Sequence, residues 1–315
     1  MSLVTFANAL KLDTQGNIVL FDDNPAEQTK LLNRLKQNRL FKLLNLVQTR
    51  YPQGEAIGLF TPIAGTTNTD VAERSPKHAL APAQKYDCEQ VNIDSYIRYE
   101  KMDAYNLENS LEERLNHLLD DNLLRGLLML GWQGVSRTST SNPQLNPLAQ
   151  DVKKGWLQKI REGKPQAVIN GASVGEGQTF KNINSLIKQG LSKISPAYST
   201  GGDMIAICGR NIIGEEIIQF EHTDLSENLA DLLTLCQKTK GGLKAVSIPY
   251  FPSNAILITR LDNLSLYVHL NNIRRRVIDE PRKDSVQTFY SLNIDYIVED
   301  FNACCLIENI EIIEE

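Results

Sequence analysis

Histidine and cysteine are scarce in this chain of 315 residues, and neither is arranged as a metal site would require. The histidines are isolated, and the HExxH pattern of zinc hydrolases is absent. No CxxC pair occurs, and the odd, irregularly spaced cysteines do not indicate a disulfide framework. We therefore expect no metal and no cofactor, and thiols buried as small hydrophobic side chains. The residues are His78, His117, His222 and His269, and Cys88, Cys208, Cys236, Cys304 and Cys305.

Positive charge is not in excess, and long apolar runs are absent. Lys and Arg number 33 against 38 Asp and Glu, which gives a formal net charge of −5. A protein that grips nucleic acid carries a basic surface, so this balance argues against that class. The balance does not exclude a protein wall that encloses DNA at a distance. No run approaches the ~20 apolar residues of a membrane span, and the first residues lack a signal-peptide pattern, so we expect a protein kept in the cytoplasm or in something assembled there.

Catalytic motifs are missing as well. The GxSxG elbow is absent, and no pair of carboxylates stands out as acid and base. One glycine-rich segment, residues 171–179, precedes a predicted helix as a phosphate loop would. It lacks the lysine of the phosphate-loop motif, and Glu176 would place negative charge among the phosphates. We predict a flexible connector that binds neither ATP nor GTP, and keep a nucleotide-binding enzyme as the alternative.

The strongest helical pattern covers residues 104–131. Leucines recur at three- and four-residue spacing, with acidic residues early in the segment, where the helix dipole favours them. At 1.5 Å per residue the helix is about 40 Å long, and Gly131 is predicted to end it. Within the stripe, Leu115 and Leu119 are predicted to face a sheet. The stripe consists of Leu107, Leu111, Leu115, Leu118, Leu119, Leu123, Leu127 and Leu130.

A second distinctive region is residues 52–100. Residues 85–100 alternate between apolar and polar with a period of two, which predicts a half-buried strand. The apolar face consists of Val91, Ile93, Ser95, Ile97 and Tyr99. With the extended segment 52–65 and the polar segment 66–83, this predicts a long two-stranded excursion. A strand of about 15 residues reaches roughly 50 Å, which suits a subunit that must reach its neighbour.

The other patterns are shorter. Helices are predicted at 25–37, 151–162, 180–194 and near 226–239. Strand-like runs occur at 204–208, 244–250, 255–259 and 264–268, and again over the last forty residues. They indicate an N-terminal arm and a compact region of mixed helix and strand. A chain with long arms, one long helix and no chemical site suits a building block whose function lies in its interfaces.

Five long strings, in a fixed order between residues 73 and 312, indicate a family. They are ERSPKHAL (73–80), KYDCEQVNIDSYIRYEKMDAY (85–105), GWQGVSRTSTSNPQLNPLAQDVKKGWLQKIRE (131–162), GLKAVSIPYFPSNAILITRLDNLSLYV (242–268) and RRVIDEPRKDSVQTFYSLNIDYIVEDFNACCLIENIEI (275–312). With these strings the chain resembles the major capsid protein of the Peduoviridae, the P-two-like tailed phages.

The resemblance implies the α+β Hong-Kong-97-type capsid fold and a structural protein that is not an enzyme. It divides the chain into an N-terminal arm (1–51), an E-loop (52–100), a peripheral domain with a spine helix (101–165), an axial domain (166–274) and return strands of the peripheral domain (275–315). Such a subunit self-assembles into hexamers and pentamers of an icosahedral head around double-stranded DNA. Further implied partners are a scaffold and maturation protease and a portal protein, but no membrane. The product is a virion assembled in the bacterial cytoplasm.

Candidate contacts between subunits lie in the E-loop tip, which has too few apolar residues to form its own core. They are Thr66, Asp70, Arg74 and Lys77. Arg74 and Lys77 are predicted to pair with acids on the adjacent subunit. An encapsulin-type nanocompartment shell stays as an alternative, and a DNA-packaging particle of a phage satellite or defective prophage fits equally well.

Overall fold

The computed structural model describes residues 38–59, 64–75, 84–104, 111–214, 234–235 and 239–313. The helices are α3 (Arg39–Leu43), α4 (Tyr99–Ala104), α5 (Leu111–Gln133), α6 (Trp156–Gly163), α7 (Ile183–Leu191), α8 (Pro196–Ser199) and α9 (Arg210–Ile213), and the 3-10 turns are η1 (Pro165–Ala167), η2 (Leu261–Asn263), η3 (Pro281–Lys283) and η4 (Phe301–Ala303). The helix predicted at 25–37 lies outside these ranges. No helix in the described part of the chain is long and apolar enough to span a membrane.

The first sheet has five strands and is built on one long hairpin. Strands β12 (Leu264–Glu280) and β13 (Ser285–Val298) pair antiparallel, joined through η3 and Asp284 in a left-handed conformation. Strand β1 (Asn45–Thr49) adds in parallel to β12, while β4 (Glu89–Asn92) and β5 (Ser95–Arg98) pair with β13. Alternate side chains of the hairpin face the main core, among them Leu266, Ile294 and Tyr296.

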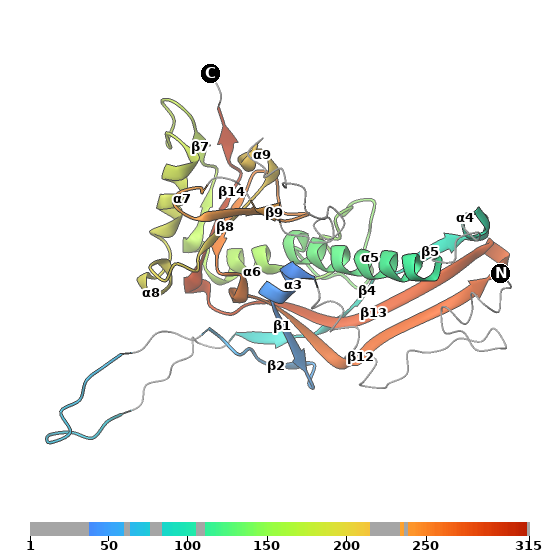
Figure 1. Ribbon diagram of the computed structural model, residues 1–315, viewed down its shortest axis with the longest axis horizontal. Coiled ribbons are helices and arrows are strands. Elements are labelled where there is room, and N and C mark those ends of the chain that lie inside the picture. The colour runs from blue at the N-terminus through green and yellow to red at the C-terminus, as the bar shows by residue number, and fades with distance from the viewer. Residues whose placement is uncertain are drawn as a thin grey trace.

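Helix α5 runs along this sheet (Figure 1). The predicted leucine stripe is confirmed at Leu123, Leu127 and Leu130, which are buried in the main core. The side chains of Leu115 and Leu119, like all others at 111–120, lie outside the described part, as does Leu107. Past the stripe, the ring of Trp156 packs against those of Trp132 and Tyr296, with centroid separations of 4.8 and 4.9 Å.

The prediction that Gly131 ends this helix is wrong. Helix α5 continues to Gln133. A Cβ atom at position 131 would lie 2.4 Å from the Trp156 ring, so glycine is required there for close packing. Helix α6 likewise begins at Trp156 and not at residue 151, because Gly155 is the N-cap and its amide is bound to the Gly134 carbonyl at 3.0 Å.

The second sheet has six strands in the order β6-β14-β11-β8-β10-β9. They are β6 (Val168–Asn170), β14 (Cys304–Glu308), β11 (Ile256–Thr259), β8 (Ile205–Cys208), β10 (Lys244–Ser247) and β9 (Thr234–Leu235). Helix α7 begins with a capping box at Asn182 and buries Leu186 and Ile187 in the second core. The runs at 204–208, 244–250 and 255–259 are thereby confirmed as strands.

Three features of this sheet bear on the sequence expectations. The C-terminal strand β14 does not return to the first sheet, because it lies between β6 and β11 of the second. The division between an axial domain ending at 274 and return strands from 275 cuts through the continuous strand β12. Of the helix expected near 226–239, Thr234 and Leu235 form a strand with β10, and most of the rest lies outside the described residues.

Two adjacent crossovers connect the sheets. The chain passes from β11 through η2 into β12, and back from β13 through η4 into β14. Fully buried Asn263 joins them: its side-chain oxygen accepts the Asp300 amide at 2.8 Å, and its side-chain nitrogen donates to the Asp300 carbonyl at 3.0 Å. Asp300 in turn accepts the Tyr198 hydroxyl at 2.7 Å. The two sheets therefore share one hydrogen-bonded junction.

Candidate assembly surface

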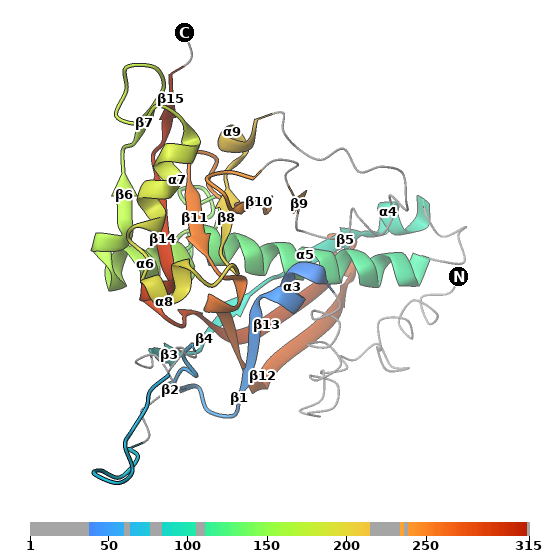
Figure 2. The same ribbon diagram turned by 60° about the vertical axis from the view of Figure 1, so that its left-hand side comes forward.

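A two-legged extension projects from the body of the molecule (Figures 1 and 2). Strands β2 (Gln53–Glu55) and β3 (Lys85–Asp87) pair antiparallel at its base. The described tip, residues 64–75, is exposed throughout. A local turn orders it, in which the Asn68 carbonyl accepts the amides of Val71 and Ala72 at 3.2 and 3.1 Å. The tip therefore protrudes into solvent with no core among its described residues.

Three of the four predicted contact residues lie on this tip. Thr66, Asp70 and Arg74 are exposed, whereas Lys77 lies outside the described residues. Within the described part of the chain, neither Asp70 nor Arg74 takes part in an ion pair. Val71, which the sequence analysis did not single out, is 83% exposed at the turn. Both charge and an apolar side chain are thus available to a neighbour.

The extension is shorter than the predicted excursion over residues 52–100. The predicted alternation is confirmed, because odd-numbered residues from Val91 to Tyr99 are buried or half-buried and even-numbered ones are exposed. Residues 89–98, however, pair with β13 in the five-stranded sheet. Their apolar face packs on the body, with Ile93 against α5 at Gly126. Only the segment up to about residue 88 leaves the body.

The base of the extension has a small apolar core of its own. Ala56, Tyr86 and Cys88 pack on Tyr267 and Ile297 of the first sheet. The rings of Tyr86 and Tyr267 are stacked, with centroids 4.8 Å apart. Opposite Tyr86 the first leg carries Gly54, where a Cβ would lie 2.6 Å from the Tyr86 hydroxyl. The Tyr86 ring thus fits against the first leg only because Gly54 has no side chain.

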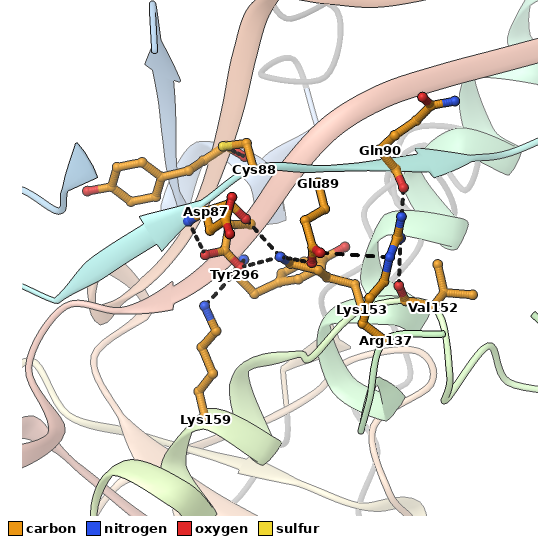
Figure 3. A network of polar contacts seen from close by, with 11 residues as sticks. Asp87, Cys88, Glu89, Gln90, Arg137, Val152, Lys153, Lys159 and Tyr296 are labelled. Atoms are coloured by element: carbon orange, nitrogen blue, oxygen red, sulfur yellow. Dashed lines mark hydrogen bonds and ion pairs between the residues drawn. The ribbon is translucent and has the colours of Figure 1, made fainter. Parts of the chain in front are cut away.

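A buried ion network surrounds the second leg (Figure 3). Asp295 of β13 accepts the Asp87 amide at 2.9 Å and binds the ammonium groups of Lys159 at 2.8 Å and Lys153 at 3.4 Å. Lys153, whose side chain is 7% exposed, also binds the Glu89 carboxylate at 2.6 Å and the Asp87 carbonyl at 2.8 Å. Two lysines from α6 and the loop before it therefore compensate two carboxylates beside the leg.

Burial changes the acid–base properties of these groups. It raises the pKa of the Cys88 thiol to about 11, with a further contribution from the charge of Asp295. It lowers the pKa of Lys159, against the opposing effect of Asp295. Cys88 is thus a neutral thiol at physiological pH, and the arrangement has the character of a structural support.

Two other kinds of site were considered in the sequence: a metal site and the glycine-rich segment 171–179. Among the described residues no group of three or more His, Cys, Asp and Glu side chains could hold a metal ion. The glycine-rich segment 171–179 is ordered: strand β7 (Ser173–Val174) pairs with β15 (Glu311–Ile312), and the Gly171 and Gly175 amides bind the carbonyls of Glu308 and Phe180. Those amides face protein carbonyls, whereas a phosphate loop directs its amides at the ligand.

Comparisons with known proteins decide what this architecture is. A family model described as "Phage major capsid protein, P2 family" matches residues 5–310. The chain belongs to this family. It is 34% identical to the "Capsid proteins" of Escherichia phage P2 over 93% of this chain and 87% of that one. It is 28% identical to the "Major capsid protein" of Serratia phage KSP20, over 92% of this chain and 89% of that one.

Solved structures agree. A chain of the "Satellite phage P4 procapsid including size determination (Sid) protein" has a TM-score of 0.78 and 33% identity, with 91% of each chain covered. The "Capsid of empty GTA particle computed with C5 symmetry" has a TM-score of 0.51 and 13% identity, over 86% of this chain and 89% of that one, and so supports the fold alone. The subunit has the Hong-Kong-97-type capsid fold and is a phage major capsid protein, a component of a self-assembled shell and virion.

The encapsulin alternative is the weaker one, because the family model and both curated relatives are phage capsid proteins. The prediction of buried thiols is confirmed for Cys88, Cys208, Cys304 and Cys305. Cys236 lies outside the described residues. Adjacent Cys304 and Cys305 point to opposite faces of β14, one into each core.

Proposed function

We propose that this capsid protein forms hexamers and pentamers of an icosahedral head that encloses double-stranded DNA, and that the extension at residues 52–88 is the E-loop that contacts a neighbouring subunit. One observation carries the second part: a segment of 12 consecutive described residues, 64–75, is exposed throughout and lies far from its own body (Figure 1). An isolated subunit gains nothing from ordering such a segment, since each ordered residue costs about 1–2 kcal/mol of conformational entropy.

The two sheets correspond, in this proposal, to the two domains of the fold. The five-stranded sheet with α5 as spine helix forms the peripheral domain, and the six-stranded sheet with α7 forms the axial domain. The proposed N-terminal arm (1–51) includes α3, whose side chains Leu40 and Phe41 are buried in the main core. The β12–β13 hairpin thus belongs wholly to the peripheral domain, with β14 in the axial domain.

Further partners are proposed for this subunit from its role as a capsid protein. A scaffold and maturation protease and a portal protein are the partners that the family resemblance implies. Assembly would take place in the bacterial cytoplasm, and the subunit would have no enzymatic activity. Contact with packaged DNA would be non-specific, which fits a chain with a net charge of −5 better than tight phosphate binding does.

Charge reversal at the tip tests the role of the extension. We expect Arg74→Glu to leave the circular dichroism spectrum and melting temperature of the subunit unchanged, because Arg74 is exposed. Shell yield in negative-stain microscopy and sedimentation should fall. A rim ion pair is worth only ~0–1 kcal/mol, but a closed shell repeats every contact many times.

Arg74→Lys is the matched control, since it preserves the charge, and it should assemble close to wild-type yield. Normal assembly of Arg74→Glu, or tip residues 66–75 packed on their own subunit within a shell, would contradict the proposed role of the extension.

A further inference from the structure

Two buried carboxylates lie at the base of the extension: Asp295 near the C-terminal end of β13, and Glu299 directly after this strand. Asp295 and Glu299 are 2% and 0% exposed. They are four residues apart, roughly 13 Å along an extended chain, and Ile297 lies between them in the small apolar core at the base. The two acids thus lie on either side of the patch on which the extension packs.

Glu299 binds the first leg. Its Oε2 accepts the Gly58 amide at 2.6 Å, and its Oε1 accepts the hydroxyls of Ser265 and Tyr267. The Tyr267 hydroxyl in turn accepts the Ile57 amide at 2.9 Å. Burial, reinforced by Glu299, raises the pKa of Tyr267, which therefore stays a phenol able to donate to the carboxylate. Two consecutive amides of the leg are held through one acid.

Asp295 binds the second leg in the same way. Its Oδ2 accepts the Asp87 amide at 2.9 Å, while Lys159 holds its Oδ1. In both cases the acceptor is a buried carboxylate and the donor is a backbone amide of the leg. Hydrogen bonds to a charged acceptor are the stronger kind, and their geometry depends on the path of the leg's backbone.

We infer that Asp295 and Glu299 are positioning residues that fix the direction in which the extension leaves the subunit. A single attachment would let a two-stranded ribbon swing about that point. Attachment of the legs at two separate sites, Asp295 in β13 and Glu299 directly after it, removes that freedom. The role in assembly rests on the proposed function of the extension, whereas the attachment itself is a property of the subunit alone.

The test uses amide hydrogen exchange of the full-length protein, unassembled and in shells, followed by mass spectrometry. Glu299→Ala should accelerate exchange in residues 56–59, and Asp295→Ala in residues 85–88, each by roughly tenfold or more relative to wild type. The body strands β8 and β11 should change only as much as the global stability changes.

Asp300→Ala is the matched control. Asp300 is also a buried carboxylate on the same stretch of chain, 7% exposed, but it binds Tyr198 and Asn302 of the body and not the extension. It should destabilise the protein without selective exchange in either leg. Glu299→Gln should restore protection of residues 56–59, because its carbonyl oxygen can still accept the Gly58 amide.

If neither alanine variant folds, Glu299→Gln and Asp295→Asn decide the matter. Each keeps an acceptor oxygen but loses the charge that strengthens the hydrogen bond. A slight loosening confined to residues 56–59 in Glu299→Gln and to 85–88 in Asp295→Asn supports the inference, and uniform change in both variants overturns it. Unchanged exchange in the legs of the alanine variants overturns it as well. These results are separate from those of Arg74→Glu. A loosened leg combined with normal assembly of Arg74→Glu would uphold the attachment and refute the proposed role in assembly.

Discussion

At the scale of single residues, Gly126 and Gly131 show how differently two glycines in one helix are constrained. Both lie in α5, where glycine lowers helix stability relative to alanine. A Cβ at 126 would meet the flexible end of Ile93 at 3.0 Å, whereas one at 131 would meet the Trp156 ring at 2.4 Å and Tyr296 at 3.0 Å. Only the second position requires glycine.

We therefore expect Gly131→Ala to lower the free energy of unfolding by about 1–3 kcal/mol through overpacking. Gly126→Ala should change it by less than about 1 kcal/mol, because the gain in helix propensity offsets a small shift of Ile93. Urea denaturation of both variants measures the difference. Equal effects at the two positions would show that the aromatic contact does not constrain residue 131.

The buried thiol at the base of the extension predicts a pH dependence. The pKa of Cys88 is about 11 in the folded protein, against 9.0 for a free thiol. Because the folded value is the higher one, the unfolded chain loses its proton first as the pH rises. Stability is unaffected below about pH 9 and falls between pH 9 and 11, on the order of 2 kcal/mol in total.

Chemical denaturation at a series of pH values from 7 to 10.5 tests this expectation. Cys88→Ala should show a shallower decline than wild type over the upper part of the range. Slow alkylation of Cys88 at pH 8 in the folded state, and fast alkylation in urea, would agree with it. Identical pH profiles for the two proteins would contradict it.

At the scale of elements, the described side chains of α5, residues 121–133, include both deeply buried and exposed positions. Leu127 is 1% exposed, and the Leu127 carbonyl also accepts the Tyr296 hydroxyl at 2.7 Å. The same helix carries exposed Asn122 one turn and a half earlier. A core position, Leu127, and a surface position, Asn122, thus lie within a few residues of one another on the same helix.

Leu127→Ala should cost about 2–5 kcal/mol in the free energy of unfolding, because it leaves a cavity in a packed core. Asn122→Ala serves as the control and should stay within about 0.5 kcal/mol of wild type. Thermal and urea unfolding provide the measurement. The corresponding expectation for Leu115, a loss of about 2–5 kcal/mol if that leucine is buried, stays a prediction.

Residue patterns predicted these elements well and their partners poorly. The alternation from Val91 to Tyr99 gave the buried face correctly, because each side chain's polarity reports which side of the strand meets water. It could not tell that β13 pairs with that strand, since a period of two carries no information on the neighbour. The polar tip at Thr66, Asp70 and Arg74 was recognisable from composition, but the attachment at Asp295 and Glu299 is over 200 residues away in sequence from the legs it holds.

At the scale of the whole molecule, the two sheets are linked through Asn263. Its side chain makes hydrogen bonds to both the amide and the carbonyl of Asp300 across the crossovers. No sequence pattern marks this residue, because a fully buried asparagine and an exposed one look alike in a turn. The C-terminal run was predicted as a strand, but its place in the second sheet was not, because its apolar residues fit either sheet.

Asn263→Ala should destabilise the protein by about 1–3 kcal/mol, since it leaves buried polar groups of both crossovers without partners. Exposed Asn254, which binds Asn211 at the surface, is the control, and Asn254→Ala should have little effect. Differential scanning calorimetry would also show whether the two sheets still unfold together. A single unchanged transition for Asn263→Ala would argue against the junction.

The place of β14 has a consequence for the order in which the second sheet can be completed. This strand, Cys304–Glu308, lies between β6 and β11. As long as residues 304–308 are not in place, the six-stranded sheet lacks an inner strand. The edges of β6 and β11 that face it are then open, and an open edge is a template for pairing with another chain. Insertion of β14 is therefore the step that closes this sheet to unspecific strand pairing.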